Sequence, residues 1–303
     1  MKLNVLSNSE IKRCCKNEGL VITIGPYVFR IRSSMQDIHR NLGKLYGQFE
    51  LAKEDEIVDF NIQIDMPYGF RRFYKPQVDF KLEGYAPFLP LPATQAFPIL
   101  EWGMNWCIAQ HTFDYLSIHA ATIEKNGFTA VLPAESGSGK STLTAIMVSN
   151  GWRLLSDEMT LISLRTGAVS PISRPISLKN RSIEVVKAYN SEAIFSNVVS
   201  DTNKGTIGHM KSPDSSIESI NKTAGISAFI FPKYEARADC NLSPKVKGEA
   251  LLSAIEQSFN YDILGKIGFK TLTKVIEQAN CYDFKYSSTQ DAVDTFEALA
   301  QSL

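Results

Sequence analysis

The sequence predicts an α/β protein with two packed units, a smaller α+β unit over residues 1–112 and a larger α/β unit over residues 113–303. Three observations lead to this prediction. A chain of 303 residues is longer than one hydrophobic core usually fills. The first third mixes strand-like and helix-like periods of apolar residues. In the middle of the chain, a strand pattern leads through a glycine-rich loop into a helix pattern.

Strand and helix patterns alternate in the first unit. Apolar residues take every second position over residues 27–32 and again over residues 60–65, as in half-buried strands. Between these strands, apolar residues at three- and four-residue steps indicate one face of a helix: Met35, Ile38, Leu42, Leu45 and Phe49. A further strand pair is expected over residues 71–84. The proline-rich stretch that follows predicts an extended connector into a helix over residues 94–110.

The second unit is expected to open with two strand-like runs over residues 115–134, joined at Asn126-Gly127. This dipeptide is a strong signal for a two-residue hairpin turn. The second run enters the glycine loop. A helix pattern follows Lys140 and ends at Asn150-Gly151, a favourable C-terminal cap, and a short apolar strand comes next.

The remaining residues predict further elements of the second unit. Residues 200–223 are polar and rich in Ser, Thr, Asn and Lys, which favours a mobile or ligand-gripping loop. The elements expected after this loop are a buried strand over 224–232, two helices between 248 and 278, an alternating strand over 281–287 and a terminal helix over 291–300.

Composition excludes several classes of protein. Hydrophobic residues make up 44% and charged residues 21% of the chain, with 32 basic and 32 acidic side chains. This balance is typical of a soluble globular protein and argues against a general nucleic-acid binder. No secretion signal and no apolar stretch of membrane-spanning length is evident, so we expect a cytoplasmic protein. The odd count of five cysteines then favours reduced thiols.

The stretch LPAESGSGKSTL, residues 132–143, carries a phosphate-binding pattern of the Walker A type, G-x-x-x-x-G-K-[ST]. Glycines let backbone N–H groups converge on a phosphate, Lys140 would neutralise its oxygens, and Ser141 would offer a hydroxyl to Mg²⁺. Ala134 stands where the pattern begins with glycine, which is tolerable if its φ is negative. The predicted ATP contacts are Glu135, Ser136, Gly137, Ser138, Gly139, Lys140, Ser141 and Thr142. The alternative is a serine-glycine turn that Lys-Ser follows by chance.

Two adjacent carboxylates, Asp157 and Glu158, end the strand that follows the loop helix. A strand beside the loop strand would bring them near the phosphates, where such a pair can hold Mg²⁺ or accept a proton from an attacking hydroxyl. The alternative is a turn aspartate beside a solvated glutamate. Ser141 and Glu158 are the predicted magnesium ligands.

His119, the glycine loop and the acidic pair follow one another in an order that resembles the HPr kinase/phosphorylase family, and within it the HPr-kinase-related (kinase A type) subgroup. The resemblance covers residues 115–303. It implies a P-loop kinase core related to nucleotide-dependent PEP carboxykinase, transfer of phosphate to a serine hydroxyl, and possible homo-oligomers. It also implies Asp157 as catalytic base, Glu158 as metal ligand or partner of the base, and His119 as an orienting group. Without it, a lone histidine on an apolar strand is typical of a hydrogen-bonded core residue.

The chain also departs from this family. The bifunctional enzymes carry a glutamate and an arginine before a glycine some way after the paired acids, and SRPISLKNRSIEV has no matching glutamate. The resemblance therefore does not extend to phosphorylase activity or to the carrier-protein substrate. Four basic residues could still gather charge around a transferring phosphoryl group, or could be solvated: Arg174, Lys179, His209 and Lys211.

The predicted function is that of an ATP-dependent kinase that phosphorylates a hydroxyl, most simply a serine, of a protein, peptide or small molecule. Two alternatives stay open. A P-loop ATPase of the transporter kind would need a downstream Ser-Gly-Gly run, which the sequence lacks. A nucleotide-dependent binding protein without catalysis would not need Lys140, Ser141, Asp157 and Glu158 together.

Overall fold

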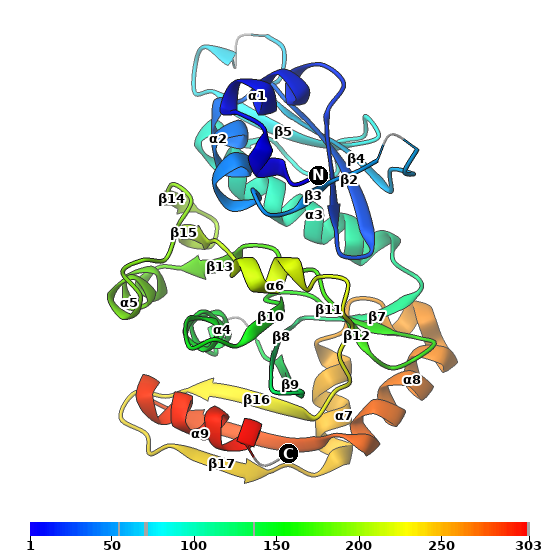
Figure 1. The fold of residues 1–303 in the computed structure, drawn as a ribbon, viewed down its shortest axis with the longest axis vertical. Helices are drawn as coiled ribbons and strands as arrows, with labels where there is room; N and C mark the ends of the chain where they lie inside the picture. Colours follow the sequence, from blue (N-terminus) through cyan, green and yellow to red (C-terminus); the bar gives the residue numbers. More distant parts are fainter. Residues whose placement is uncertain (54, 70–71, 136, 302–303) are drawn as a thin grey trace.

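The protein has a mixed α/β fold with several sheets (Figure 1). The computed structural model describes residues 1–53, 55–69, 72–135 and 137–301. The first part of the chain forms the upper body of the view, and helix α3 (Ala96–His111) runs along its lower side, facing the rest of the molecule. No helix in the described ranges is long and apolar enough to cross a membrane.

The N-terminal sheet has six strands in the order β3 (Glu50–Leu51), β1 (Leu20–Ile24), β2 (Tyr27–Ser33), β4 (Phe60–Asp65), β5 (Gln77–Leu82) and β6 (Leu91–Pro92). Beside it lie the 3-10 turns η1 (Leu3–Val5) and η3 (Ala93–Gln95) and the helices α1 (Asn8–Lys16) and α2 (Gln36–Leu45). The predictions of β2, β4, α2 and α3 are confirmed. The strand pair expected over residues 71–84 is wrong in its described part, because β5 pairs there with β4 and β6 instead.

Helix α3 joins the N-terminal sheet to the rest of the chain. It is apolar on nearly all sides, which is typical of a helix buried between two layers. One hydrophobic cluster holds side chains from the N-terminal sheet, from α3 and from later segments, among them Met159, Leu161, Ile172 and Ile217. The two parts of the chain therefore share packing along this face. The domain boundary at residues 112/113 stays a prediction.

The central sheet has the order β10 (Arg153–Ser156), β8 (Ala120–Lys125), β9 (Phe128–Pro133), β16 (Ala228–Tyr234), β18 (Asn280–Tyr286) and β17 (Asn241–Pro244). The β8–β9 hairpin turns at Asn126 and Gly127, whose φ values of 53° and 85° confirm the predicted tight turn. Parallel pairing of β9 with β16 and of β16 with β18 makes the middle of the sheet a buried α/β core.

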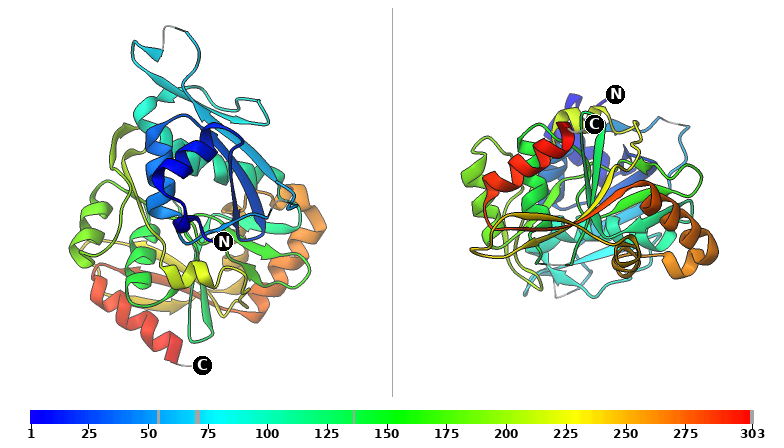
Figure 2. Two further views of the ribbon diagram at one scale, coloured as in Figure 1. Left: turned by 45° about the horizontal axis from the view of Figure 1, so that its top comes forward. Right: turned by 90° about the horizontal axis from the view of Figure 1, so that it is seen from below.

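Helices cover the central sheet on both sides (Figures 1 and 2). One cluster of buried side chains joins it to α4 (Lys140–Ser149) and to the terminal helix α9 (Thr289–Gln301). A second cluster joins it to α7 (Lys247–Glu256) and α8 (Tyr261–Gln278). The predicted elements of the last 80 or so residues are confirmed.

Two small sheets complete the fold. Strands β12 (Val169–Ser170), β11 (Thr160–Ser163) and β7 (Tyr115–Ile118) form one, and β13 (Ile176–Lys179), β15 (Gly205–Met210) and β14 (Val199–Thr202) form the other, beside helix α5 (Arg181–Tyr189). The loop expected over residues 200–223 is wrong for most of its length, since it contains the β14–β15 hairpin and helix α6 (Asp214–Glu218). Buried Ile207, Met210 and Ile217 give this polar segment enough apolar contact to fold.

Candidate nucleotide and phosphoryl-transfer site

The glycine loop connects β9 to α4, as the sequence predicts. Gly137 and Gly139 have φ values of 96° and 88°, in the left-handed region that favours glycine. Ala134 is buried and has no positive φ, so a methyl group at this position causes no backbone strain. This explains why the loop accepts alanine at the first position of the pattern.

Two tyrosines from the central sheet brace the loop. The Tyr234 N–H donates to the Ser138 carbonyl oxygen at 2.9 Å, and the Tyr286 hydroxyl donates to the Gly139 carbonyl oxygen at 3.3 Å. A Cβ atom on Gly139 would lie 2.8 Å from the Tyr286 hydroxyl and 2.9 Å from the Tyr234 Cβ. Both the conformation and the close approach therefore require glycine at position 139.

A cleft of about 750 Å³ opens in front of the loop, a volume within the range of small-molecule sites. One side, which we call the glycine-loop wall, consists of the loop and the start of α4. The part of the lining that lies on helix α3, Trp102 and Asn105, we call the α3 wall. Other lining residues are His119, Glu158, Lys179, Asn203, Lys204 and Phe259.

Lys140 begins α4 at the floor of this cleft. The residue is only 6% exposed, and its Nζ atom has no hydrogen-bond partner among the described residues. Burial lowers the pKa of Lys140 to about 8, against the opposing effects of the Asp157 and Glu158 charges. A buried ammonium without a partner is costly, and an anion in the cleft would remove that cost.

Asp157 follows β10, which pairs with β8 rather than lying beside the loop strand β9 as the sequence predicts, and it reaches the start of α4 through Ser141. The Ser141 hydroxyl donates to its Oδ2 atom at 3.2 Å, and the Ser177 N–H donates to the same oxygen at 3.1 Å. The Oδ1 atom is buried, with no hydrogen-bond partner in the described part of the chain. Burial, and secondly the negative charge of Glu158, raise the pKa of Asp157 to about 7. The carboxylate itself does not line the cleft. It lies next to two residues that do, Ser141 and Glu158.

Glu158 is the member of the acidic pair that lines the cleft. Burial alone would raise its pKa, but the charges of Lys204, Lys179 and Lys140 outweigh burial and lower it. Glu158 is therefore an anion at neutral pH, surrounded by cations that a phosphate would also attract.

His119 lies between β7 and β8, where its backbone N–H donates to the Gln257 carbonyl oxygen at 2.7 Å. Its ring lies 5.9 Å from the Phe259 ring. Burial, and secondly the Lys140 charge, lower the pKa of His119 to about 4. The imidazole is neutral at pH 7, so it can orient a neighbouring group by hydrogen bonding but carries no positive charge.

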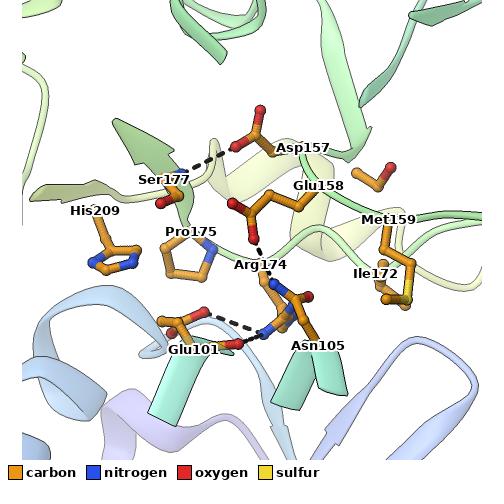
Figure 3. Close-up of a pocket in the computed structure, with 11 residues that line it drawn as sticks. Glu101, Asn105, Asp157, Glu158, Met159, Ile172, Arg174, Pro175, Ser177 and His209 are labelled. Carbon is orange, nitrogen blue, oxygen red and sulfur yellow. Dashed lines mark hydrogen bonds and ion pairs between the residues drawn. The ribbon is translucent and has the colours of Figure 1, made fainter. Parts of the chain in front are cut away.

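A smaller cavity, of about 20 Å³, is lined by both members of the acidic pair, Asp157 and Glu158 (Figure 3). Arg174 forms an ion pair with Glu101, 3.2 Å from Nη1 to Oε2, and both side chains are less than a tenth exposed. Arg174 Nη2 also donates to Asn105, whose amide donates to Glu158. His209 closes the cavity, packed edge-on against Phe97, and burial lowers its pKa to about 4.

The structure thus gathers most of the predicted site residues but not all of them. The cleft is lined by the predicted residues Glu135, Gly137, Ser138, Gly139, Lys140, Ser141, Thr142, Lys179, His119 and Glu158. Ser136 lies outside the described residues. Arg174 and His209 line the smaller cavity, and Lys211 lies in neither, with Nζ 2.6 Å from Asp214 Oδ1. Their predicted contacts with a phosphoryl group stay untested.

Sequence reasoning missed nine of the described residues that line the cleft, among them Trp102, Asn105, Lys204 and Phe259. The polar Asn105 within an apolar helix pattern was an available signal, since a buried amide needs partners. Lys204 gave no such signal, because its place beside the Trp102 ring, at 5.1 Å, depends on the β14–β15 hairpin.

Comparisons with known proteins add little. No family model matches the chain, and no curated protein matches it. Among solved structures, the chain is similar to the Hpr(Ser) kinase/phosphatase from Coxiella burnetii, with 9% identity over 62% of this chain and 99% of that one. The TM-score is 0.28, which is too low to support an inference about function. The site has to be interpreted from its own residues.

Proposed function

We propose that the protein is an ATP-dependent kinase that transfers the γ-phosphoryl group to a hydroxyl, such as a serine, of a protein, peptide or small molecule. One observation carries the proposal. Lys140 is the first residue of the helix that follows the glycine loop, and its buried Nζ has no partner within the described ranges. The hydroxyl of the next residue, Ser141, donates to the buried carboxylate of Asp157. A helix N-terminus, a free cation and a base are the elements that phosphoryl transfer requires.

The residues present fit a nucleotide with Mg²⁺. Orphaned Lys140 Nζ fits the β- and γ-phosphate oxygens, and the left-handed glycines leave room for them at the loop. No group of three or more His, Cys, Asp or Glu side chains that could hold a metal occurs in the described part of the chain. Mg²⁺ would therefore share its coordination between Ser141, Glu158 and phosphate oxygens, as it often does. When bound, it neutralises charge on the phosphates.

In the proposed mechanism, Asp157 acts as the general base. As the acceptor oxygen forms its bond to the γ-phosphorus, the bond to the β-phosphate oxygen breaks, ADP leaves, and the acceptor proton passes to the Asp157 carboxylate. A carboxyl group with a pKa of about 7 holds a proton more tightly than an ordinary aspartate, which suits this role near neutral pH. His119, neutral and beside Phe259, would orient the acceptor.

The test is ADP release from ATP by the whole protein, with and without candidate acceptors. Screening of cell extract with γ-labelled ATP would find the acceptor. For a kinase, ADP release should depend on the presence of an acceptor. Acceptor-independent hydrolysis would favour a P-loop ATPase, and nucleotide binding without any turnover would favour a binding protein.

A further inference from the structure

Asn105 connects the N-terminal part of the chain to the acidic pair. Its Nδ2 group donates to Glu158 Oε2, and its Oδ1 atom accepts from Arg174 Nη2. The opposite orientation of the amide would place an NH₂ group against the guanidinium and an oxygen against the carboxylate. The two contacts therefore fix the amide in one orientation.

The second partner of Asn105 is itself held firmly. Arg174 Nη1 donates to the Glu101 carboxylate at 3.2 Å and to the Glu101 carbonyl oxygen at 3.3 Å. Glu101 lies one turn before Asn105 on α3 and also accepts from the buried Tyr46 hydroxyl at 2.5 Å. A buried, multiply bonded ion pair thus anchors the helix at the site.

Glu158 depends on this one amide for its orientation. Within the described ranges, the Asn105 contact is the hydrogen bond that the Glu158 carboxylate receives. The ammonium groups of Lys204, Lys179 and Lys140 act on it as nearby charges, which favour the ionised form but do not select a rotamer.

We propose that Asn105 is a positioning residue for Glu158, so that the N-terminal part of the chain completes the magnesium-nucleotide site. This inference rests on the proposed function, because it takes Glu158 as a ligand of the nucleotide-bound metal. A ligand held by an outer hydrogen bond binds metal better, and loss of such a partner usually costs 10-fold to 100-fold in affinity.

The experiment is a double-mutant cycle on the full chain. Calorimetry measures the affinity for a non-hydrolysable ATP analogue with and without Mg²⁺, and the ratio is the magnesium enhancement. Asn105→Leu is expected to lower this enhancement by about 10-fold or more. In the Glu158→Gln background the same substitution is expected to change it by less than about 2-fold, which is the scatter of independent sites. If Asn105→Leu does not fold, as judged by its melting curve, Asn105→Ala replaces it in the cycle.

Gln48→Ala is the matched control. Gln48 also joins the N-terminal part to the rest of the chain, donating to Asp214 at 3.2 Å, but lies away from the site. Gln48→Ala should therefore leave the magnesium enhancement unchanged. An equal loss in Gln48→Ala, no loss in Asn105→Leu, or the same loss in both Glu158 backgrounds would overturn the inference while nucleotide binding stands. A parent protein without any magnesium enhancement would overturn the proposed function as well.

Discussion

The buried charged groups beside the glycine loop and those beside helix α3 differ in whether they have a partner. Near the loop, Lys140 Nζ and Asp157 Oδ1 are buried without partners among the described residues. Beside α3, at the smaller cavity, the Glu101 carboxylate accepts from Arg174 and Tyr46, and both ends of the Asn105 amide are bonded. Unpaired buried groups cost stability and are available to a ligand, whereas paired groups fix geometry. We therefore expect substitutions near the loop to reduce function most and substitutions beside α3 to reduce stability most.

The largest expected effect falls on catalysis near the loop. Asp157→Asn should retain nucleotide binding and lose phosphoryl transfer by about 10²–10⁴-fold, because the amide cannot accept the acceptor proton. His119→Ala should lose less, since water can replace an orienting group. The measurement is initial transfer rate to a verified acceptor. Transfer at the parental rate by Asp157→Asn would remove this residue as the base.

Beside helix α3, at the buried Glu101–Arg174 pair, the expected loss is in stability. Arg174→Ala should lower the free energy of unfolding by about 3–5 kcal/mol, because it leaves the buried Glu101 carboxyl without its cation. Denaturant unfolding measures this change. Lys211→Ala, which breaks a partly exposed pair with Asp214, is the control and should cost about 1 kcal/mol or less. If the two variants lost equal stability, the buried Glu101–Arg174 pair would have no special structural role.

Nucleotide affinity should depend on the loop residue Lys140 and not on a lysine outside the cleft. Lys140→Ala should weaken binding of the magnesium nucleotide by about 1.5–3 kcal/mol, the usual value of a charge-assisted hydrogen bond. Calorimetric titration checks this, with Lys211→Ala as the control for loss of a positive charge outside the cleft. Unchanged affinity in Lys140→Ala would exclude the loop from the nucleotide site.

The smallest expected effect is the pH dependence of transfer. For kcat/KM, which reports the free protein, activity should rise with pH as Asp157 loses its proton near its pKa of about 7. It should fall again as Lys140 loses its charge near its pKa of about 8. The profile from about pH 6 to 9 should therefore be a narrow bell. Asp157→Asn should lack the acidic limb, and a flat parental profile would contradict both assignments.

The sequence by itself determined the features that depend only on residues close together along the chain. The Asn126-Gly127 turn, the left-handed glycines of the loop and the cap of α4 at Asn150 follow from local backbone preferences. The apolar periods of β2, β4, α2 and α9 follow from burial of one face. These local rules suffice for the strand–loop–helix that places Lys140.

Only the tertiary structure decided which residues Asn105 of the α3 wall contacts and how residues 200–223 fold. Asn105, Glu158 and Arg174 are far apart along the chain, and no periodic pattern specifies which of them meet. The β14–β15 hairpin forms because β15 pairs with β13 and buries Ile207 and Met210, although its composition favours a loop. In both cases long-range contacts supply the free energy that local preference lacks, and such contacts exist only once the chain has folded.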